Sequence, residues 1–68
     1  MTVTVGILGG GQLARMMALE GASLGLRFVV FDPAADACAG QVAPLHVGAF
    51  DDLEALQAFA GRVDVITF

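Results

Sequence analysis

Four short segments of the chain are continuously apolar and rich in β-branched or aromatic side chains, which is typical of strands buried on both faces of a parallel sheet. We expect these strands at Val3–Leu8, Leu26–Phe31, Leu45–Val47 and Val63–Phe68. The segments between them contain helix-forming residues and are bounded by glycine or proline. The chain is therefore predicted to alternate strands with helices.

The first predicted helix, Gln12–Leu24, has two unlike faces. Small and apolar residues on one face are expected to pack closely on the sheet: Ala14, Ala18, Gly21 and Ala22, with Leu13, Met17 and Leu24. The opposite face bears charges, but Met16 and Leu19 lie among them, which predicts that another chain or domain covers it. Gly25 is expected to end the helix in a left-handed conformation.

The second half of the chain predicts a short helix and then a longer one. Ala34–Ala43 is rich in alanine, but Gly40 and the flanking prolines limit the length of any helix there. Asp51 is predicted to cap the next helix, with Glu54 completing a capping box. The apolar face of this helix is expected to comprise Leu53, Leu56, Phe59 and Ala60, and Gly61 to close it.

This order of elements predicts an α/β fold. Strands joined by helical connections form right-handed crossovers, which give a parallel sheet with helices on both faces. We expect the strand order 3-2-1-4, as in one mononucleotide-binding half of a Rossmann-like, doubly wound fold. Its ligand crevice would lie at the carboxyl ends of the first and fourth strands.

The composition excludes several classes of protein. A chain of 68 residues forms one small domain at most. A net charge of -4, with three arginines and no lysine, argues against nucleic acid or an anionic membrane as partner. Charges interrupt every apolar stretch before it reaches the length of a membrane span. A reducing, cytoplasmic setting is predicted by the single Cys38 and by the uncharged start of the chain. The apolar end of the sequence predicts that the chain is a fragment of a longer protein.

A glycine-rich loop is the principal candidate site. Gly9, Gly11 and Ala14 match the pattern G-x-G-x-x-G/A, and the pattern lies between a predicted strand and a predicted helix. Glycines there let an anion approach the backbone N–H groups at the positive end of the helix. The alternative is that the glycines only allow a tight turn, and their position favours an anion or substrate contact.

Asp32 follows the second predicted strand, 21 residues after Gly11. A dinucleotide-binding enzyme places the acid that holds the ribose hydroxyls at this point. A carboxylate in an Asp-Pro turn also accepts backbone N–H groups, so Asp32 leaves the two interpretations open.

Four other polar side chains bear on the choice of site residues. Gln12 can offer its side-chain amide to a substrate. Arg15, one helical turn from the loop, either reaches a phosphate or remains a solvated surface residue. His46 and Cys38 have no partner that would make them catalytic, and no residue is predicted to be catalytic or to bind a metal.

The loop and helix read GILGGGQLARMM at residues 6–17. This string resembles the N-terminal segment of the 5-(carboxyamino)imidazole ribonucleotide synthase family, which consists of ATP-grasp enzymes of purine biosynthesis. The similarity continues through Asp32-Pro33, Gln41, Asp51-Asp52 and residues 64–68, and so covers the whole chain. The resemblance implies that residues 1–68 are a truncated preATP-grasp half-domain without the ATP-grasp and C-terminal domains.

The resemblance also implies what the parent enzyme does. It would join bicarbonate to 5-aminoimidazole ribonucleotide while cleaving ATP to ADP and phosphate, with ATP and Mg²⁺ bound outside this segment. Substrate contact is carried over to Gly10, Gly11, Gln12 and Leu13, with Gly9, Asp32 and Arg15 as further candidates. The parent is expected to be a cytoplasmic homodimer, and the segment alone is expected to be inactive and to bind no cofactor.

Three alternative functions remain at this point. One is the NAD(P)-binding half of a dehydrogenase, which the loop and Asp32 would also suit. The second is a formate-dependent glycinamide ribonucleotide formyltransferase, although that family usually carries Glu at the position of Gln12. The third is a free-standing nucleotide-binding module without enzyme activity.

Overall fold

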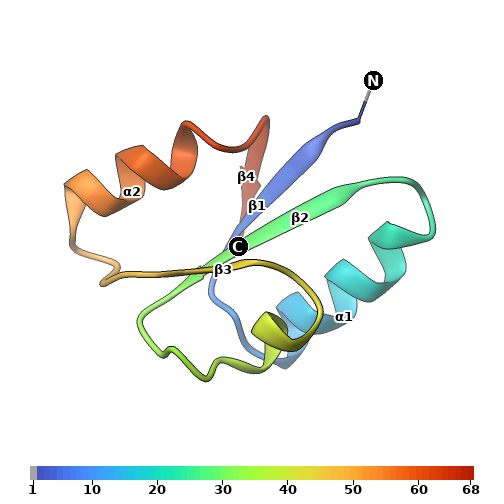
Figure 1. Cartoon of the computed structure of the whole chain (residues 1–68), viewed down its shortest axis with the longest axis horizontal. Coiled ribbons are helices and arrows are strands. Elements are labelled where there is room, and N and C mark those ends of the chain that lie inside the picture. The colour runs from blue at the N-terminus through green and yellow to red at the C-terminus, as the bar shows by residue number, and fades with distance from the viewer. Residues whose placement is uncertain (1) are drawn as a thin grey trace.

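A computed structural model of the protein describes residues 2–68 and shows one sheet of four parallel strands (Figure 1). The strands are β1 (Thr4–Leu8), β2 (Arg27–Asp32), β3 (Leu45–Val47) and β4 (Val65–Thr67). They lie in the order β3-β2-β1-β4, which confirms the predicted order 3-2-1-4 and the α/β fold class. Because all pairs are parallel, the carboxyl ends of the strands meet at one edge of the sheet.

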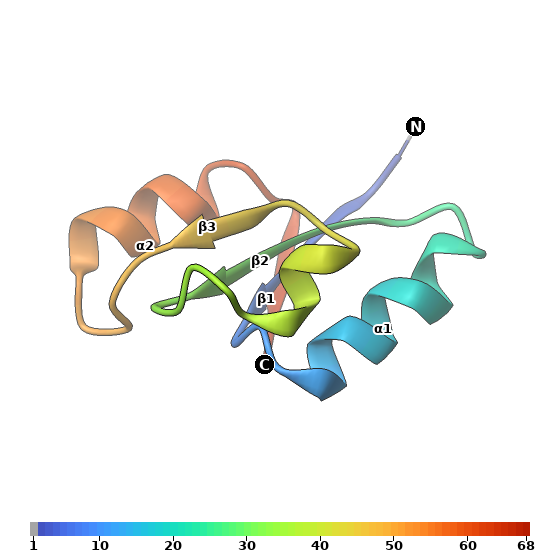
Figure 2. The same ribbon diagram turned by 60° about the horizontal axis from the view of Figure 1, so that its bottom comes forward.

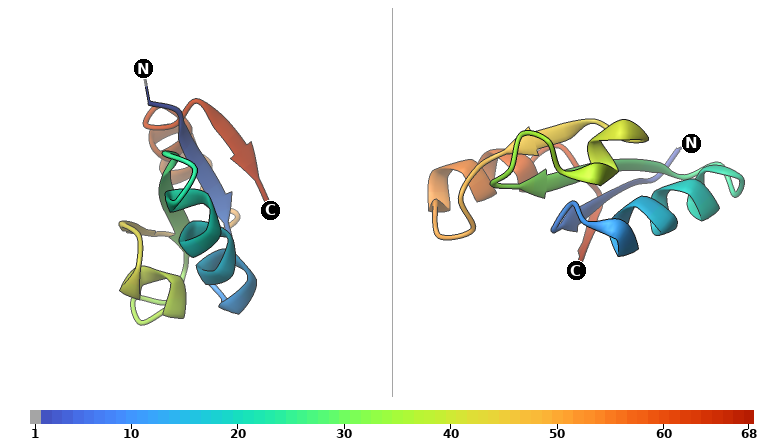
Figure 3. Two further views of the ribbon diagram at one scale, coloured as in Figure 1. Left: turned by 90° about the vertical axis from the view of Figure 1, so that its right-hand side faces the viewer. Right: turned by 90° about the horizontal axis from the view of Figure 1, so that it is seen from below.

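Helices cover both faces of the sheet (Figure 3). Each face has its own core of buried side chains. Helix α1 (Gln12–Ala22) and the short 3-10 helix η1 (Cys38–Gln41) lie over the face that contains Ile7 and Val30. Helix α2 (Leu53–Ala60) lies over the opposite face, where Phe59 packs with residues of β2. Side chains alternate between the two faces along each strand, so β1 and β2 are buried on both sides.

Helix α1 approaches the sheet closely, as the small residues predicted. Ala14, Ala18 and Gly21 are buried, and a Cβ atom on Gly21 would overlap the ring of Phe28. The prediction was wrong for Ala22, which is exposed, and for Leu13 and Leu24, which are 68% and 78% exposed. Contact at the small residues sets the rotation of the helix, and a residue next to Ala14 is turned about 100° away from the sheet.

The end of α1 also differs from the prediction. The helix ends at Ala22 rather than Leu24, because residues 23–25 form a turn in which the Leu24 N–H donates to the Gly21 carbonyl at 2.9 Å. Gly25 has a φ of 81°, which confirms its predicted left-handed conformation. Leu24 therefore belongs to the turn and not to a helix face.

Asp52, and not Asp51, is the N-cap of α2. Its carboxylate accepts the Ala55 N–H at 3.1 Å. Asp51 lies in the preceding turn, which the hydrogen bond from the Asp52 N–H to the Ala49 carbonyl closes at 3.1 Å. The helix therefore begins one residue later than a cap at Asp51 requires, and the predicted capping box with Glu54 does not form.

The predicted apolar face of α2 is narrower in the structure, and two predicted segments are shorter. The apolar face of α2 rests on Leu56 and the buried Phe59, while Leu53 and Ala60 are exposed. Only η1 is helical within Ala34–Ala43. The predicted strand Val63–Phe68 is reduced to β4, because it pairs with β1 only from Val65 to Thr67.

Candidate functional site

The glycine-rich loop joins β1 to α1 at the carboxyl edge of the sheet, and its first glycine is required by backbone conformation. Gly9 has a φ of 105°, a region that side chains disfavour. Its N–H donates to the carbonyl of Phe31 at 2.7 Å, so the chain leaves β1 while still bonded to β2. This geometry turns the chain away from the sheet and toward the helix.

The second glycine is required by space. A Cβ atom on Gly10 would lie 3.0 Å from the Cβ of Ala37 and 3.3 Å from that of Asp32. The Gly10 N–H donates to Asp32 Oδ2 at 2.8 Å, and its carbonyl accepts the Ala39 N–H at 2.9 Å. Gly10 is thus buried, and its amide is already used within the fold.

The third glycine leaves the start of α1 open. Gly11 is the N-cap residue, with extended backbone and no capping side chain, and a Cβ atom there would meet nothing within 4 Å. Gly11, Gln12 and Leu13 are exposed, and no group of residues 2–68 accepts their N–H groups. Unpaired amides at the positive end of a helix attract an anion.

A hollow of about 210 Å³ lies beside these amides. It is lined by residues from the end of β1, the loop, α1 and the last residue of the chain: Ile7, Leu8, Gly9, Gly11, Leu13, Ala14, Met17 and Phe68. Figure 2 shows the C-terminus beside the turn that leads into α1. The hollow therefore lies where the sequence placed the crevice, at the carboxyl ends of β1 and β4.

Asp32 supports the loop from the end of β2. One carboxylate oxygen accepts the Gly10 N–H at 2.8 Å and the other accepts the Ala34 N–H at 2.9 Å. Of the two interpretations that the sequence left open, this geometry is that of a turn-forming aspartate. The carboxylate fixes the glycine loop relative to β2.

Removing the Asp32 carboxylate is expected to loosen the loop. In the Asp32→Ala variant two backbone N–H groups lose their acceptor, which should lower the free energy of unfolding by about 1–3 kcal/mol. Hydrogen exchange of the Gly10 amide in the intact protein measures the effect. Asp36→Ala, at an exposed acidic residue nearby, is the matched control, and equal exchange at Gly10 in both variants would contradict the assignment.

The side chain of Gln12 is exposed at the first turn of α1, and Cys38 lies beside it. Cys38 Sγ is 3.5 Å from Gln12 Oε1 and 3.7 Å from the Gly10 carbonyl oxygen. Sequence reasoning gave Cys38 no role, and nothing in the local sequence indicates this proximity, since the two residues are 26 positions apart.

Arg15 and His46 do not contribute to the hollow. Arg15 is not among the lining residues, and its Nε is buried without a hydrogen-bond partner among residues 2–68. The His46 ring packs against Phe31, with 5.3 Å between ring centroids, and its Nδ1 lies 3.4 Å from the Arg62 guanidinium. This is the packed position that the sequence favoured for His46.

Within residues 2–68, no three His, Cys, Asp or Glu side chains gather as a metal site would require. In the same part of the chain, no helix has the length and hydropathy to cross a membrane.

The fold and the loop define a doubly wound α/β half-domain that presents free backbone amides at the start of its first helix. The chain belongs to the family described as the ribonucleotide synthetase preATP-grasp domain, whose model matches residues 1–68.

Relatives with a named activity support this assignment. The N5-carboxyaminoimidazole ribonucleotide synthase of Pseudomonas aeruginosa is 48% identical over 65 residues, which are 94% of this chain and 18% of that protein. The synthase of Bacillus subtilis is 42% identical over 65 residues, again 94% of this chain and 17% of that protein. The chain therefore spans about a fifth of the length of these relatives.

Solved structures show the same fold. The N5-carboxyaminoimidazole ribonucleotide synthetase of Thermus thermophilus matches with a TM-score of 0.89 and 55% identity, over 91% of this chain and 17% of that one. The synthetase of Staphylococcus aureus, complexed with ADP, matches with a TM-score of 0.91 and 41% identity, over 96% of this chain and 18% of that one. These matches support the synthase family over the dehydrogenase and formyltransferase alternatives.

Proposed function

We propose that the intact protein is an ATP-dependent ligase that carboxylates 5-aminoimidazole ribonucleotide with bicarbonate in purine biosynthesis. The family and the names of its relatives support this reaction. The segment of residues 1–68 contributes the ribonucleotide-binding loop and no catalytic residue. ATP is cleaved to ADP and phosphate in the reaction, and the segment alone is inactive.

The observation that carries the binding role is the set of free amides at the start of α1. Gly11, Gln12 and Leu13 expose N–H groups without an acceptor among residues 2–68, beside the hollow at the carboxyl edge. They can donate to a negatively charged group of the substrate without any movement of the backbone. The Gln12 side chain is exposed in the first turn of α1 and can add a hydrogen bond to the substrate. Gly9, Gly10 and Asp32 shape the loop.

ATP and Mg²⁺ belong to the rest of the intact protein. The chain has no lysine, and residues 2–68 offer no cluster of carboxylates that could hold a metal ion. These residues therefore offer no metal site, and we assign ATP and Mg²⁺ to the parts of the intact protein outside this segment. A related synthetase has been solved in complex with ADP, which agrees with ATP chemistry in the parent family.

The proposal is tested on the intact protein by measuring ADP release. We expect release to require both 5-aminoimidazole ribonucleotide and bicarbonate, and the product to carry one added carboxylate. ADP release that is independent of the ribonucleotide would overturn the proposed reaction. Tight binding of NADH would support the dehydrogenase alternative instead.

We also propose that the intact protein is a cytoplasmic homodimer. Met16 and Leu19 support an additional contact on α1, because they are 57% and 48% exposed on the face away from the sheet. Light scattering of the intact protein gives the oligomeric state, and a monomeric mass would contradict the proposal.

A further inference from the structure

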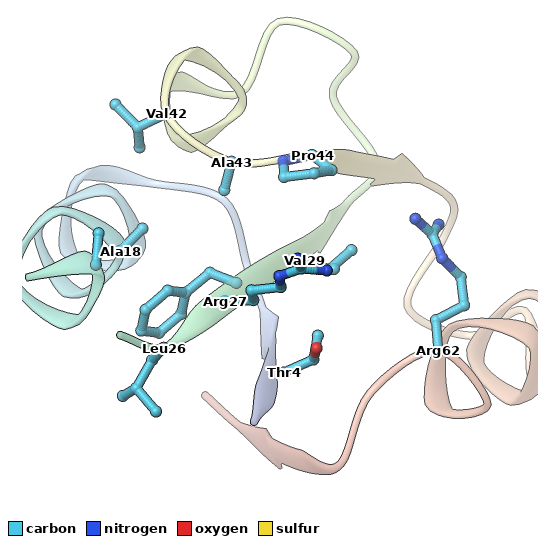
Figure 4. A pocket seen from close by; sticks show the side chains of 11 residues that line it. Thr4, Ala18, Leu26, Arg27, Val29, Val42, Ala43, Pro44 and Arg62 are labelled. Carbon is cyan, nitrogen blue, oxygen red and sulfur yellow. The ribbon is translucent and has the colours of Figure 1, made fainter. Parts of the chain in front are cut away.

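A second hollow, of about 520 Å³, lies beside the start of β2, along the edge of that strand that faces away from β1 (Figure 4). β3 pairs with β2 only from Val30 onward. The residues before Val30 therefore border a notch, which we name the β2 notch. Its walls come from α1, β2 and the segment that leads into β3: Ala18, Ala22, Leu26, Arg27, Phe28, Val29, Val42, Ala43 and Pro44, with Thr4 and Arg62.

Pro44 explains why the notch stays open. The Val30 N–H donates to the Pro44 carbonyl at 2.9 Å, and in a parallel ladder the next bond would run from the N–H of residue 44 to the carbonyl of Phe28. Proline has no N–H, so the ladder stops there. Along β2 the backbone groups alternate in direction, and the Arg27 N–H points to β1 because it donates to Val3. The N–H and carbonyl of Phe28 therefore face the notch.

Two of the three arginines of this acidic chain border the same notch. Figure 4 shows Arg27 beside Val29 on β2 and Arg62 extending from the end of α2. No carboxylate of residues 2–68 accepts a hydrogen bond from either guanidinium, and within these residues the one side-chain hydrogen bond of the pair joins Arg62 to His46 Nδ1 at 3.4 Å. The nearby Asp64 carboxylate instead accepts the Thr4 N–H at 2.8 Å.

We propose that the β2 notch binds a small molecule through an oxyanion, a carboxylate or a phosphate. Guanidinium groups recognise both anions with paired hydrogen bonds, and the Phe28 N–H supplies a further donor. Apolar side chains such as Ala22, Leu26 and Val42 would contact the body of the ligand. The volume is within the range of small-molecule sites. A single residue with an unpaired N–H and carbonyl is too short an edge to bind a peptide as an added strand.

The notch is separate from the glycine loop. Arg27 and Phe28 begin β2, whereas the loop is bonded to Phe31 and Asp32 at its other end. Phe31 lies four residue steps along the strand from Arg27, a distance of about 13 Å. The two sites share none of their lining residues. The notch is therefore a distinct site from the proposed substrate contact.

The test follows the Phe28 amide in the intact protein labelled with ¹⁵N-phenylalanine. Inorganic phosphate and acetate are titrated separately, with the loop site saturated by 5-aminoimidazole ribonucleotide. We expect the Phe28 resonance to shift saturably with at least one of the two anions. Arg27→Gln and Arg62→Gln should each weaken this binding at least tenfold, while Arg27→Lys and Arg62→Lys retain part of it.

Gln57→Glu is the matched control, because it changes the net charge by the same amount at an exposed residue outside the notch. It should leave the affinity unchanged. A response to phosphate alone or acetate alone supports the site and identifies its anion. The absence of any Phe28 shift, or equal affinities in wild type and both glutamine variants, would overturn the proposal whether or not the ligase activity is found.

Discussion

Replacing Gly11 with aspartate is expected to raise the KM of the intact protein for 5-aminoimidazole ribonucleotide by about 100-fold, which corresponds to about 2.7 kcal/mol of lost binding. Gly11 is the N-cap of α1 and has no capping side chain. An aspartate there would accept the free N–H groups of the first turn, as Asp52 does in α2. It would also place a negative charge beside the free amides that we propose bind the substrate anion.

The same variant should fold at least as well as the wild type. The Gly11 backbone is extended, and a Cβ atom would meet nothing within 4 Å. A capping aspartate adds a few tenths of a kcal/mol compared with glycine. The loss of binding would therefore come without a loss of stability, as expected where a helix end is left uncapped for function.

Two variants complete this experiment. Gly11→Ala adds a side chain without a charge and should raise KM less than the aspartate does. Gly61→Ala makes the same change at the end of α2, where the nearest atom to the new Cβ is 3.6 Å away, and should leave KM unchanged. An unaltered KM in Gly11→Asp would contradict the binding role of the loop.

Replacing Phe59 with alanine should lower the free energy of unfolding by about 3–5 kcal/mol. The Phe59 ring is fully buried between α2 and the sheet, and its centroid lies 5.3 Å from that of Phe31. A Cβ atom on Gly6 would lie 2.9 Å from this ring, so the strand backbone packs directly against it. No neighbouring side chain can easily fill the cavity that the substitution leaves.

Hydrogen exchange of the β1 and β2 amides in the intact protein measures this effect, and protection should fall about 100-fold or more. Phe50→Ala is the matched control, since Phe50 also contacts Phe31, with 5.9 Å between centroids, but is half exposed. Equal losses of protection in both variants would show that the core is not centred on Phe59.

Much of the fold could be predicted because its signals extend over whole segments. Apolar β-branched runs identified all four strands, and crossover handedness then gave the order β3-β2-β1-β4. The incorrect predictions concern the N-cap of α2 and the rotation of α1, and each of these features is determined by a single contact. Either Asp51 or Asp52 could cap α2, and the turn from Ala49 selects Asp52. The rotation of α1 depends on Gly21 against Phe28, which no periodicity reveals.

Only those features of the site that depend on residues close together in the sequence could be predicted. The glycine pattern predicted a turn into a helix, and the structure has Gly9 in the left-handed region and Gly11 at the N-cap. The engagement of Gly10 by Asp32, and the position of Cys38 beside Gln12, depend on residues more than 20 positions away. Such contacts follow from the packing of η1 and β2 on the loop, and the spacing of residue types does not encode them.

The anchoring of Gly10 also constrains when the loop can form during synthesis. Its N–H is held by Asp32 and its carbonyl by Ala39, so a nascent chain that has released only β1 and α1 from the ribosome lacks both anchors. β1 must likewise wait for β4, in which Val65 pairs with Val5, before its second edge is paired. The glycine loop is therefore translated early but adopts its final conformation late. Contacts between residues that lie far apart in the sequence slow folding.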